Sequence, residues 1–578
     1  MRPLSGLVTV SVTVLAVTFT LSCARSPMPT PQPPAPSDFS RLVDAYFDAK
    51  FAFEPSSGTA VGFHQHDRAF EDLSRARVEA RAAEVKGFIS RLRTLPPQRL
   101  APDEALDRAF LISQAGAELF DLETRQSWRR NPMTYAHLPG ESIDALMKRA
   151  FAPAPERLRS VIARLRALPH FYDVARANLE DPAPEHTALA LRMAKGSVGF
   201  FESATRAWAK TTGADAALLG DFTAANDAAL AATRAFATWL ERELTPRSRG
   251  AFALGTERYR ELLRLQELVE TPLPELLAMG EAQLEKDRAA FVATAAKIAP
   301  GQSPTEVMAS LVSDHPKPAD LVASVARDLE AARRFATEKQ LVTFPSETRP
   351  RVEETPPYAR AAVFASMDTP GPFEVPGLDA FYYVTPVEPE WTPEHVEEHL
   401  RMFNRYTTAI INVHEAYPGH FLQFLYMPRV TSKVRKLMYT TANVEGWAHY
   451  TEQMMVDEGF GGGDPRVRLA QLQEALLRDC RFVAAIKLHT QGMTVDQATA
   501  LFVERGLQER ANGREEAMRG TYDPMYLAYT LGKLQIQQLR DRYLAARPGR
   551  GLRDFHDAFV AQGGLPVAFV EKVILTAP

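Results

Sequence analysis

The residues of this chain best suited to metal chemistry stand in the stretch NVHEAYPGHFLQ, residues 412–423. His414 and Glu415 begin it as the zinc-hydrolase signature H-E-x-x-H begins. In that signature two histidines on one helix face bind the ion, and the glutamate takes a proton from water. Zinc with three protein ligands and one open position lowers the pKa of a bound water to about 7. Here, however, Pro418 stands where the second histidine belongs, and the next histidine is His420.

The spacing of the two histidines decides whether they can share an ion. On a regular helix six residues rotate by about 600°, which leaves His420 about 120° away from His414. Pro418 cannot donate a hydrogen bond to the carbonyl of His414, and its ring clashes there, whereas Gly419 tolerates unusual backbone angles. We therefore predict a kink or bulge at Pro418–Gly419 that turns both imidazoles toward one zinc ion per chain.

A third ligand is available on NVEGWAHYTEQMM, a segment that reads as a helix. We predict that Glu445 completes the ligand set. His449 and Glu452 follow near the same helix face and would orient the ligands through hydrogen bonds. If His420 faced away, His449 would be its replacement, because it lies one turn beyond Glu445. The sequence also leaves open a chance His-Glu pair, a solvated or partly buried His449 and a surface position for Glu452.

Three stretches, HEAYPGHFLQ, EGWAHYTEQM and GTYDPMYLAYTLGKLQI, resemble the bacterial family called domain of unknown function 885. The resemblance covers most of the chain and is most specific in these C-terminal motifs. It implies a mainly α, zincin-like fold of the gluzincin type around a deep channel, and many members are lipoproteins. It also implies His414, His420 and Glu445 as metal ligands and Glu415 as the catalytic carboxylate.

Two further stretches are similar to that family. In CRFVAAIKLHTQGMT, Arg481 and His489 frame a position that is acidic in the family and is Ala485 here, so the role of that acid is open. We expect Arg481 to orient neighbouring groups. The stretch YLAYTLG supplies Tyr526 and Tyr529. A zinc peptidase needs a hydrogen-bond donor for its oxyanion, and Tyr529, Tyr526 and His489 are the candidates. For each tyrosine, packing in the core is the alternative.

Helices must position these residues, because the pattern is helical through nearly all of the chain after the N-terminal segment. In ERLRSVIARLRALP, for example, Leu158, Val161 and Leu165 share one helix face, and Pro169 is expected to end the run. The helical pattern predicts a mainly α protein.

Residues 343–391 differ, with dense prolines and the β-like runs AAVFAS and AFYYVT. They predict a small sheet or extended arm before the candidate site. Thr392 then caps a new helix. We expect one large domain over residues 38–578, with an N-terminal helical part at about 38–342 and a metal-site part at about 343–578.

The N-terminus predicts export. Residues 1–23 contain Arg2, an apolar run and then Cys23 after a small residue, which is typical of a lipoprotein signal peptide. Thr20 replaces the leucine usual in such signals, so an ordinary cleaved signal is the alternative. Residues 24–37 are proline-rich and predict an extended tether. We expect a protein that is lipid-anchored at Cys23 in the bacterial cell envelope, on the periplasmic side of a membrane or at the cell surface.

Composition excludes several classes of protein. The net charge is −4 with no run of lysines or arginines, so we expect no nucleic-acid partner. Two cysteines exclude a disulfide framework and a cysteine zinc site. The leading hypothesis is a zinc-dependent hydrolase of peptide bonds, with a peptide as substrate and Glu415 as general base. The alternatives are a metal-dependent hydrolase of another amide or ester, and a catalytically inactive peptide-binding surface lipoprotein.

Overall fold

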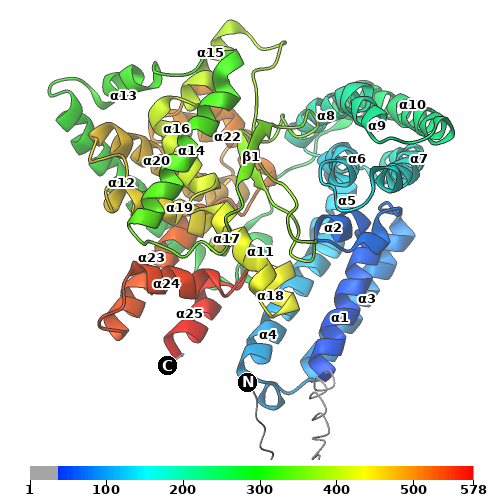
Figure 1. Ribbon diagram of the computed structural model, residues 1–578, viewed down its shortest axis with the longest axis horizontal. Helices are drawn as coiled ribbons and strands as arrows, with labels where there is room; N and C mark the ends of the chain where they lie inside the picture. The colour runs from blue at the N-terminus through cyan, green and yellow to red at the C-terminus, as the bar shows by residue number, and fades with distance from the viewer. Residues whose placement is uncertain (1–36, 577–578) are drawn as a thin grey trace, which may run out of the picture.

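The computed structural model describes residues 37–576, which form mostly helices (Figure 1). The predicted signal peptide, Cys23 and the tether up to residue 36 lie outside these residues. The mainly α fold class predicted from the sequence is confirmed. Among the helices that the structure describes, none combines the length and apolar character needed to cross a membrane.

The first helices form one corner of the molecule. The side chain of Ser37 accepts a hydrogen bond of 3.0 Å from the backbone N–H of Ser40 and so caps α1. Helix α1 buries Phe39, Val43 and Phe47 against the rest of the protein. The helices of this corner are α1 (Asp38–Phe53), α2 (Pro55–Ala60), α3 (Arg75–Thr94), α4 (Pro102–Phe120) and α5 (Ser127–Arg130).

The next five helices group at one end of the molecule around a core of their own (Figure 1). As predicted, Leu158, Val161 and Leu165 share a face, and all three are fully buried. The expectation that Pro169 ends this helix is wrong, because burial of Phe171 and its neighbours holds the next turns in place. The helices of the group are α6 (Pro132–Met147), α7 (Ala154–Asn178), α8 (Pro184–Gly199), α9 (Thr205–Thr211) and α10 (Ala216–Trp239).

A small sheet follows four further helices. Strand β3 is central: it pairs in parallel with β1 and antiparallel with β2, so that Val352 and Met367 both lie opposite Tyr382. The predicted sheet is confirmed, although β1 was not expected, since its sequence PRVEE is rich in charge. The elements are α11 (Thr256–Gln266), α12 (Leu273–Ile298), α13 (Pro304–Val312), α14 (Leu321–Glu338), β1 (Pro350–Glu354), β2 (Ala365–Asp368) and β3 (Ala380–Val384).

The C-terminal helices pack against both earlier groups. The largest core joins Phe47 of α1 to Val413, Trp447 and Phe555 near the C-terminal end, so it contains residues from both predicted parts. The helices are α15 (Pro393–Met402), α16 (Arg405–Glu415), α17 (His420–Tyr426), α18 (Lys433–Leu437), α19 (Thr441–Asp457), α20 (Pro465–Thr490), α21 (Val495–Glu504), α22 (Arg510–Tyr522), α23 (Ala528–Ala546), α24 (Leu552–Val560) and α25 (Val567–Thr576).

Candidate metal centre

The helix that bears His414 ends directly after it, at Glu415, and a second helix begins at His420. Residues 416–419 join the two helices, and the Tyr417–Pro418 peptide bond among them is cis. The predicted departure from regular helical geometry is confirmed, but it is a complete break rather than a kink. The two histidines therefore stand on different helices, and the 120° offset of a single helix no longer separates them.

Gly419 makes the break compact. Its N–H donates a hydrogen bond of 3.0 Å to the carbonyl of Val413, across the break. A Cβ atom at this position would lie 1.8 Å from the carbonyl oxygen of His414. No side chain fits in so short a distance, so the close approach of the two chain segments requires glycine.

Glu445, on α19, meets both histidines. Its Oε2 lies 3.5 Å from Nε2 of His414 and 3.2 Å from Nε2 of His420. The candidate ligand atoms of the three residues all lie within 4.8 Å of one another. Tetrahedral bonds of about 2.0–2.2 Å to one zinc ion would separate neighbouring ligand atoms by about 3.3–3.6 Å. The three predicted ligands are thus brought together, and the two distances from Glu445 suit such an ion.

The electrostatics of this cluster favour a positive charge. Burial alone would raise the pKa of Glu445, but His420 and His414 hold it well below its usual value, so the carboxylate is ionised. Burial lowers the pKa of His414, yet Glu445 and Glu452 outweigh it and raise the pKa to about 9. Oε2 of Glu445 is buried and, despite its short approaches to the imidazoles, makes no hydrogen bond of good geometry. A cation would give this oxygen a partner.

Glu452 lies behind His414 and fixes its orientation. Its Oε1 is 2.7 Å from Nδ1 of His414, so the imidazole donates from Nδ1 and leaves Nε2 for an ion. Glu452 is fully buried and also contacts Nδ1 of His449 at 3.1 Å and Arg478 at 3.4 Å. His449 is fully buried in this network and is not one of the three clustered ligands.

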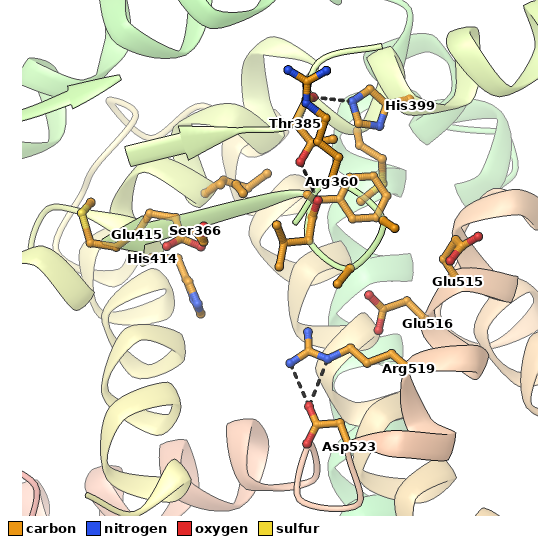
Figure 2. A pocket seen from close by; sticks show the side chains of 18 of the residues that line it. Arg360, Ser366, Thr385, His399, His414, Glu415, Glu515, Glu516, Arg519 and Asp523 are labelled. Carbon is orange, nitrogen blue, oxygen red and sulfur yellow. Dashed lines mark hydrogen bonds and ion pairs between the residues drawn. The ribbon is translucent and has the colours of Figure 1, made fainter. Parts of the chain in front are cut away.

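Glu415 lines the same cavity as the ligands and is only 8% exposed. In Figure 2 it lies beside His414, close to Ser366 of strand β2. The buried hydroxyl of Tyr382 is nearby: burial and the charge of Glu415 both raise the pKa of Tyr382 well above its usual value. The carboxylate therefore lies at the wall of the cavity that the candidate ligands also line.

The cavity has a volume of about 1300 Å³. Strand β2 and helices α15, α19, α20 and α22 form much of its wall. The N-terminal half of the chain contributes Arg192 and Lys195 of α8, which no sequence motif indicated. Sequence spacing could not have found these residues, because only the folded chain brings α8 to the cavity.

Two of the candidates implied by the family resemblance reach this cavity. Tyr529 stacks beside His414, with ring centroids 6.2 Å apart and ring planes within 14° of parallel. Its hydroxyl oxygen accepts a hydrogen bond of 3.0 Å from Arg519, and burial raises its pKa to about 12. Arg481 also lines the cavity and is held by Glu516 through two bonds of 2.6 and 2.7 Å. The acidic partner of Arg481 is thus Glu516 on α22. The sequence did not indicate it, because the position that is acidic in the family lies on α20 and is Ala485 here.

Three other positions lie away from the cavity. His489 bonds to the carbonyl of Gly520 at 2.8 Å. It lies eight residues after Arg481 on α20, which places it about 12 Å further along the helix and about 80° around it. Tyr526 precedes α23 and is fully buried, with its hydroxyl aimed at Gly520. Ala485 is buried in the core. The structure therefore does not bring His489 or Tyr526 to the metal ligands, and Tyr529 is the one of the three candidates that lines the cavity.

Close packing of two helices puts Tyr529 in place. A Cβ on Gly446 of α19 would lie 2.5 Å from the Cα of Gly532 on α23. Glycine at both positions lets the helices approach at the backbone, as small residues do at tight helix contacts. Gly446 follows Glu445, so this contact sets Tyr529 next to the candidate metal ligands. Both glycines stand in the motifs EGWAHY and YTLGK, but the sequence alone did not predict that the two would meet.

Comparisons with known proteins agree with one another. A family model described as bacterial protein of unknown function (DUF885) matches residues 55–574. A solved structure of a candidate lipoprotein of unknown function from Shewanella oneidensis is 26% identical, with a TM-score of 0.76 over 93% of this chain and 100% of that one. A candidate lipoprotein from Colwellia psychrerythraea shares the fold at 17% identity, with a TM-score of 0.77 over 93% of this chain and 98% of that one. No curated protein matches the chain.

Proposed function

The chain belongs to the DUF885 family, and we propose that it is a zinc-dependent hydrolase of peptide bonds in the bacterial cell envelope. The observation that carries the proposal is the convergence of His414, His420 and Glu445 beside Glu415. Two imidazoles and one carboxylate form a ligand set found in catalytic zinc sites, which keep a further position open. In such a site zinc supplies Lewis acidity, which makes a bound water acidic near neutral pH.

Amide hydrolysis needs a base that takes a proton from water and a donor that bonds to the carbonyl oxygen, and side chains around the candidate ligands suit both roles. Glu415 is a carboxylate at the cavity wall and would accept the proton of the attacking water. Tyr529 would donate its hydroxyl hydrogen to the carbonyl oxygen of the substrate as negative charge develops there. Arg519 supports this role, because it donates to the oxygen of Tyr529 and leaves the hydroxyl hydrogen free to point elsewhere.

A peptide fits the cavity better than an unrelated amide because a strand edge lies in its wall. Strand β2 is at the edge of the sheet, and Ala365, Ser366 and Met367 line the cavity. Its outer edge pairs with no other strand of the described chain. Such an edge offers backbone donors and acceptors to an extended peptide, which can add as a further strand.

The proposed location rests on the N-terminal segment and on the solved relatives. Cys23 follows an apolar run as in lipoprotein signals. Both relatives described above are themselves described as candidate lipoproteins. We place the protein at a membrane surface of the envelope, attached by lipid at Cys23.

The first experiment measures metal and activity together. Mature protein should carry about one zinc ion per chain after dialysis and should hydrolyse members of a mixed peptide library, read by mass spectrometry. Glu415→Gln should keep the zinc and lose hydrolysis by at least about a hundredfold, because the amide matches the carboxylate in size but cannot take a proton.

Glu515→Gln is the matched control, since Glu515 lines the cavity rim and pairs with Arg192 rather than with the ligands. It should retain both zinc and hydrolysis. A protein that stays free of metal when zinc is offered contradicts the proposal. So does a Glu415→Gln variant as active as the wild type.

A further inference from the structure

Arg519 is a charged group of the cavity that the proposed chemistry uses only through Tyr529. It stands on α22, lines the cavity, and its side chain is 28% exposed there. Figure 2 shows its guanidinium projecting into the pocket, across from His414. An arginine that keeps this much exposure inside a cavity is available to a ligand.

The hydrogen bonds of Arg519 involve two of the three guanidinium nitrogens, Nε and Nη2. Nε and Nη2 both bond to a single oxygen of Asp523, at 3.1 and 3.0 Å, and Nη2 also bonds to the hydroxyl of Tyr529. No hydrogen bond to a described residue involves Nη1. Asp523 thus fixes the side chain of this cavity-lining residue and leaves Nη1 without a described partner. Nη1 can donate a charge-assisted hydrogen bond to a carboxylate oxygen.

Two other arginines of the cavity are each paired with both oxygens of one glutamate. Arg481 is held through two nitrogens by both oxygens of Glu516. Arg192, at the rim, is held in the same way by Glu515. Arg519 uses the same two nitrogens as Arg481, but its side chain is 28% exposed in the cavity against 7% for Arg481, so it is the more accessible of the two to a further anion.

Arg519 is also close to the metal ligands. The ring of Tyr529 lies 6.2 Å from that of His414, and its hydroxyl lies 3.0 Å from Arg519. This chain of contacts places Arg519 on the order of 10 Å from His414, which is the length of two or three extended residues. A group on the substrate, a few residues from the bond that is cut, would reach it.

We propose that Arg519 binds a carboxylate of the peptide substrate, and that the enzyme selects peptides carrying that carboxylate within about three residues of the cleaved bond. The inference rests on the proposed peptidase function. The carboxylate belongs either to the C-terminus of a short peptide or to an acidic side chain. Both sources present the same planar anion to the guanidinium, and matched peptides separate them.

The test compares peptides that differ only in one carboxylate. The first pair is tetra-alanine and its C-terminal amide. The second pair is Ala-Ala-Asp-Ala amide and Ala-Ala-Asn-Ala amide. In one of the two pairs the wild type should prefer the acid by about tenfold to a hundredfold in kcat/KM, the effect expected of a charged hydrogen bond. A preference in the first pair identifies the C-terminus, and one in the second identifies a side chain.

Two variants assign the preference. Arg519→Gln should reduce it to within about twofold, whereas Arg192→Gln, which removes an equal charge from the cavity rim, should leave it intact. Because loss of the contact to Tyr529 would slow both members of a pair alike, the ratio reports on the carboxylate alone. If Arg519→Gln fails to fold, Arg519→Lys tests the same point, since a lysine has a single nitrogen, cannot hold Asp523 and a ligand as the guanidinium does, and should weaken the preference.

Equal rates within both pairs for the wild type overturn the inference, as does a full preference in Arg519→Gln. A wild type that cuts no peptide contradicts the proposed function instead. In that case calorimetry of zinc-loaded Glu415→Gln with the same four peptides decides the subsite. Tighter binding of an acid than of its amide supports it, and equal binding overturns it.

Discussion

At the residue scale, both ring nitrogens of His414 face a carboxylate. Nε2 faces Glu445 at 3.5 Å, while Nδ1 donates to Glu452 at 2.7 Å. Burial would raise the pKa of Glu452, but Arg478, His449 and His414 hold it well below its usual value, so the buried carboxylate is ionised. When an ion replaces the proton at Nε2, an ionised acceptor at Nδ1 keeps the remaining ring proton on that nitrogen, so that Nε2 is the atom that binds the ion.

We therefore expect Glu452→Gln to weaken zinc binding by about tenfold to a hundredfold without removing a ligand. Competition with a chromophoric chelator measures the affinity. Asp457→Asn, at the exposed end of the same helix, is the control and should bind zinc as the wild type does. Unchanged affinity in Glu452→Gln would show that the hydrogen bond to His414 does not tune the ion.

The residues that could be predicted are those whose spacing acts within one or two short elements. His414, Glu415 and Glu445 carry signatures of that kind. His489 was a weaker prediction, because α20 is buried on nearly all sides and its sequence does not tell which face meets the cavity. No sequence motif indicated Arg519. Its role depends on contacts with Asp523 and Tyr529, which lie on the following loop and helix and meet it only in the folded chain.

At the scale of elements, the break between α16 and α17 is what lets His414 and His420 meet Glu445. Proline and glycine indicated an irregularity, and the structure turns it into two helices whose ends meet at the ligands. The sequence could not give the extent of the break, because that depends on the fit of Gly419 against the carbonyl of His414. The strand β1 was missed for a related reason: pairing with the buried β3 outweighs its own weak β pattern.

Gly419→Ala tests the break directly. Its Cβ would lie 1.8 Å from the carbonyl oxygen of His414, so the two helices must move apart. We expect loss of most of the zinc and a fall of about 1–3 kcal/mol or more in the free energy of unfolding. Zinc analysis and denaturant unfolding of the metal-free protein measure the two effects separately.

Gly87→Ala provides the comparison, because its Cβ would meet nothing within 4 Å on helix α3. Alanine there should raise stability by up to about 1 kcal/mol and leave zinc binding unchanged. If Gly419→Ala behaved like Gly87→Ala, the tight joint between α16 and α17 would not be needed for the site.

At the scale of the whole molecule, the cavity depends on both halves of the chain. Residues of α8 face those of α22 across it, and Arg192 and Glu515 form a bidentate pair between the two helices. The largest core likewise joins α1 to the helices that carry the ligands. Such pairings between distant segments have no local sequence pattern, which is why the motifs indicated the clustered residues His414, His420 and Glu445 but not the full wall of the cavity.

A fragment of residues 343–578, the predicted metal-site part, should therefore fail to fold on its own. It would expose core surface that the missing helices cover, including the side of α16 that packs against α14. Circular dichroism in the near ultraviolet and zinc analysis, with residues 38–578 as the control, measure the outcome. A fragment that unfolds cooperatively and binds zinc would show that the metal-site part is an independent domain.

The attachment of the protein is the last property at this scale, and Cys23 is the residue that tests it. It follows the apolar run LVTVSVTVLAVTFTL and a serine, and a proline-rich stretch separates it from α1. A cysteine in this position carries acyl chains in bacterial lipoproteins, and two or more chains are needed for stable anchoring.

We expect Cys23→Ser to move the protein out of the membrane fraction or to block its processing, as fractionation and mass spectrometry would show. Cys480→Ser changes the other cysteine, which is buried in α20, and should leave fractionation unchanged. If Cys23→Ser stayed on the membrane with normal processing, the attachment would have to lie elsewhere in the chain.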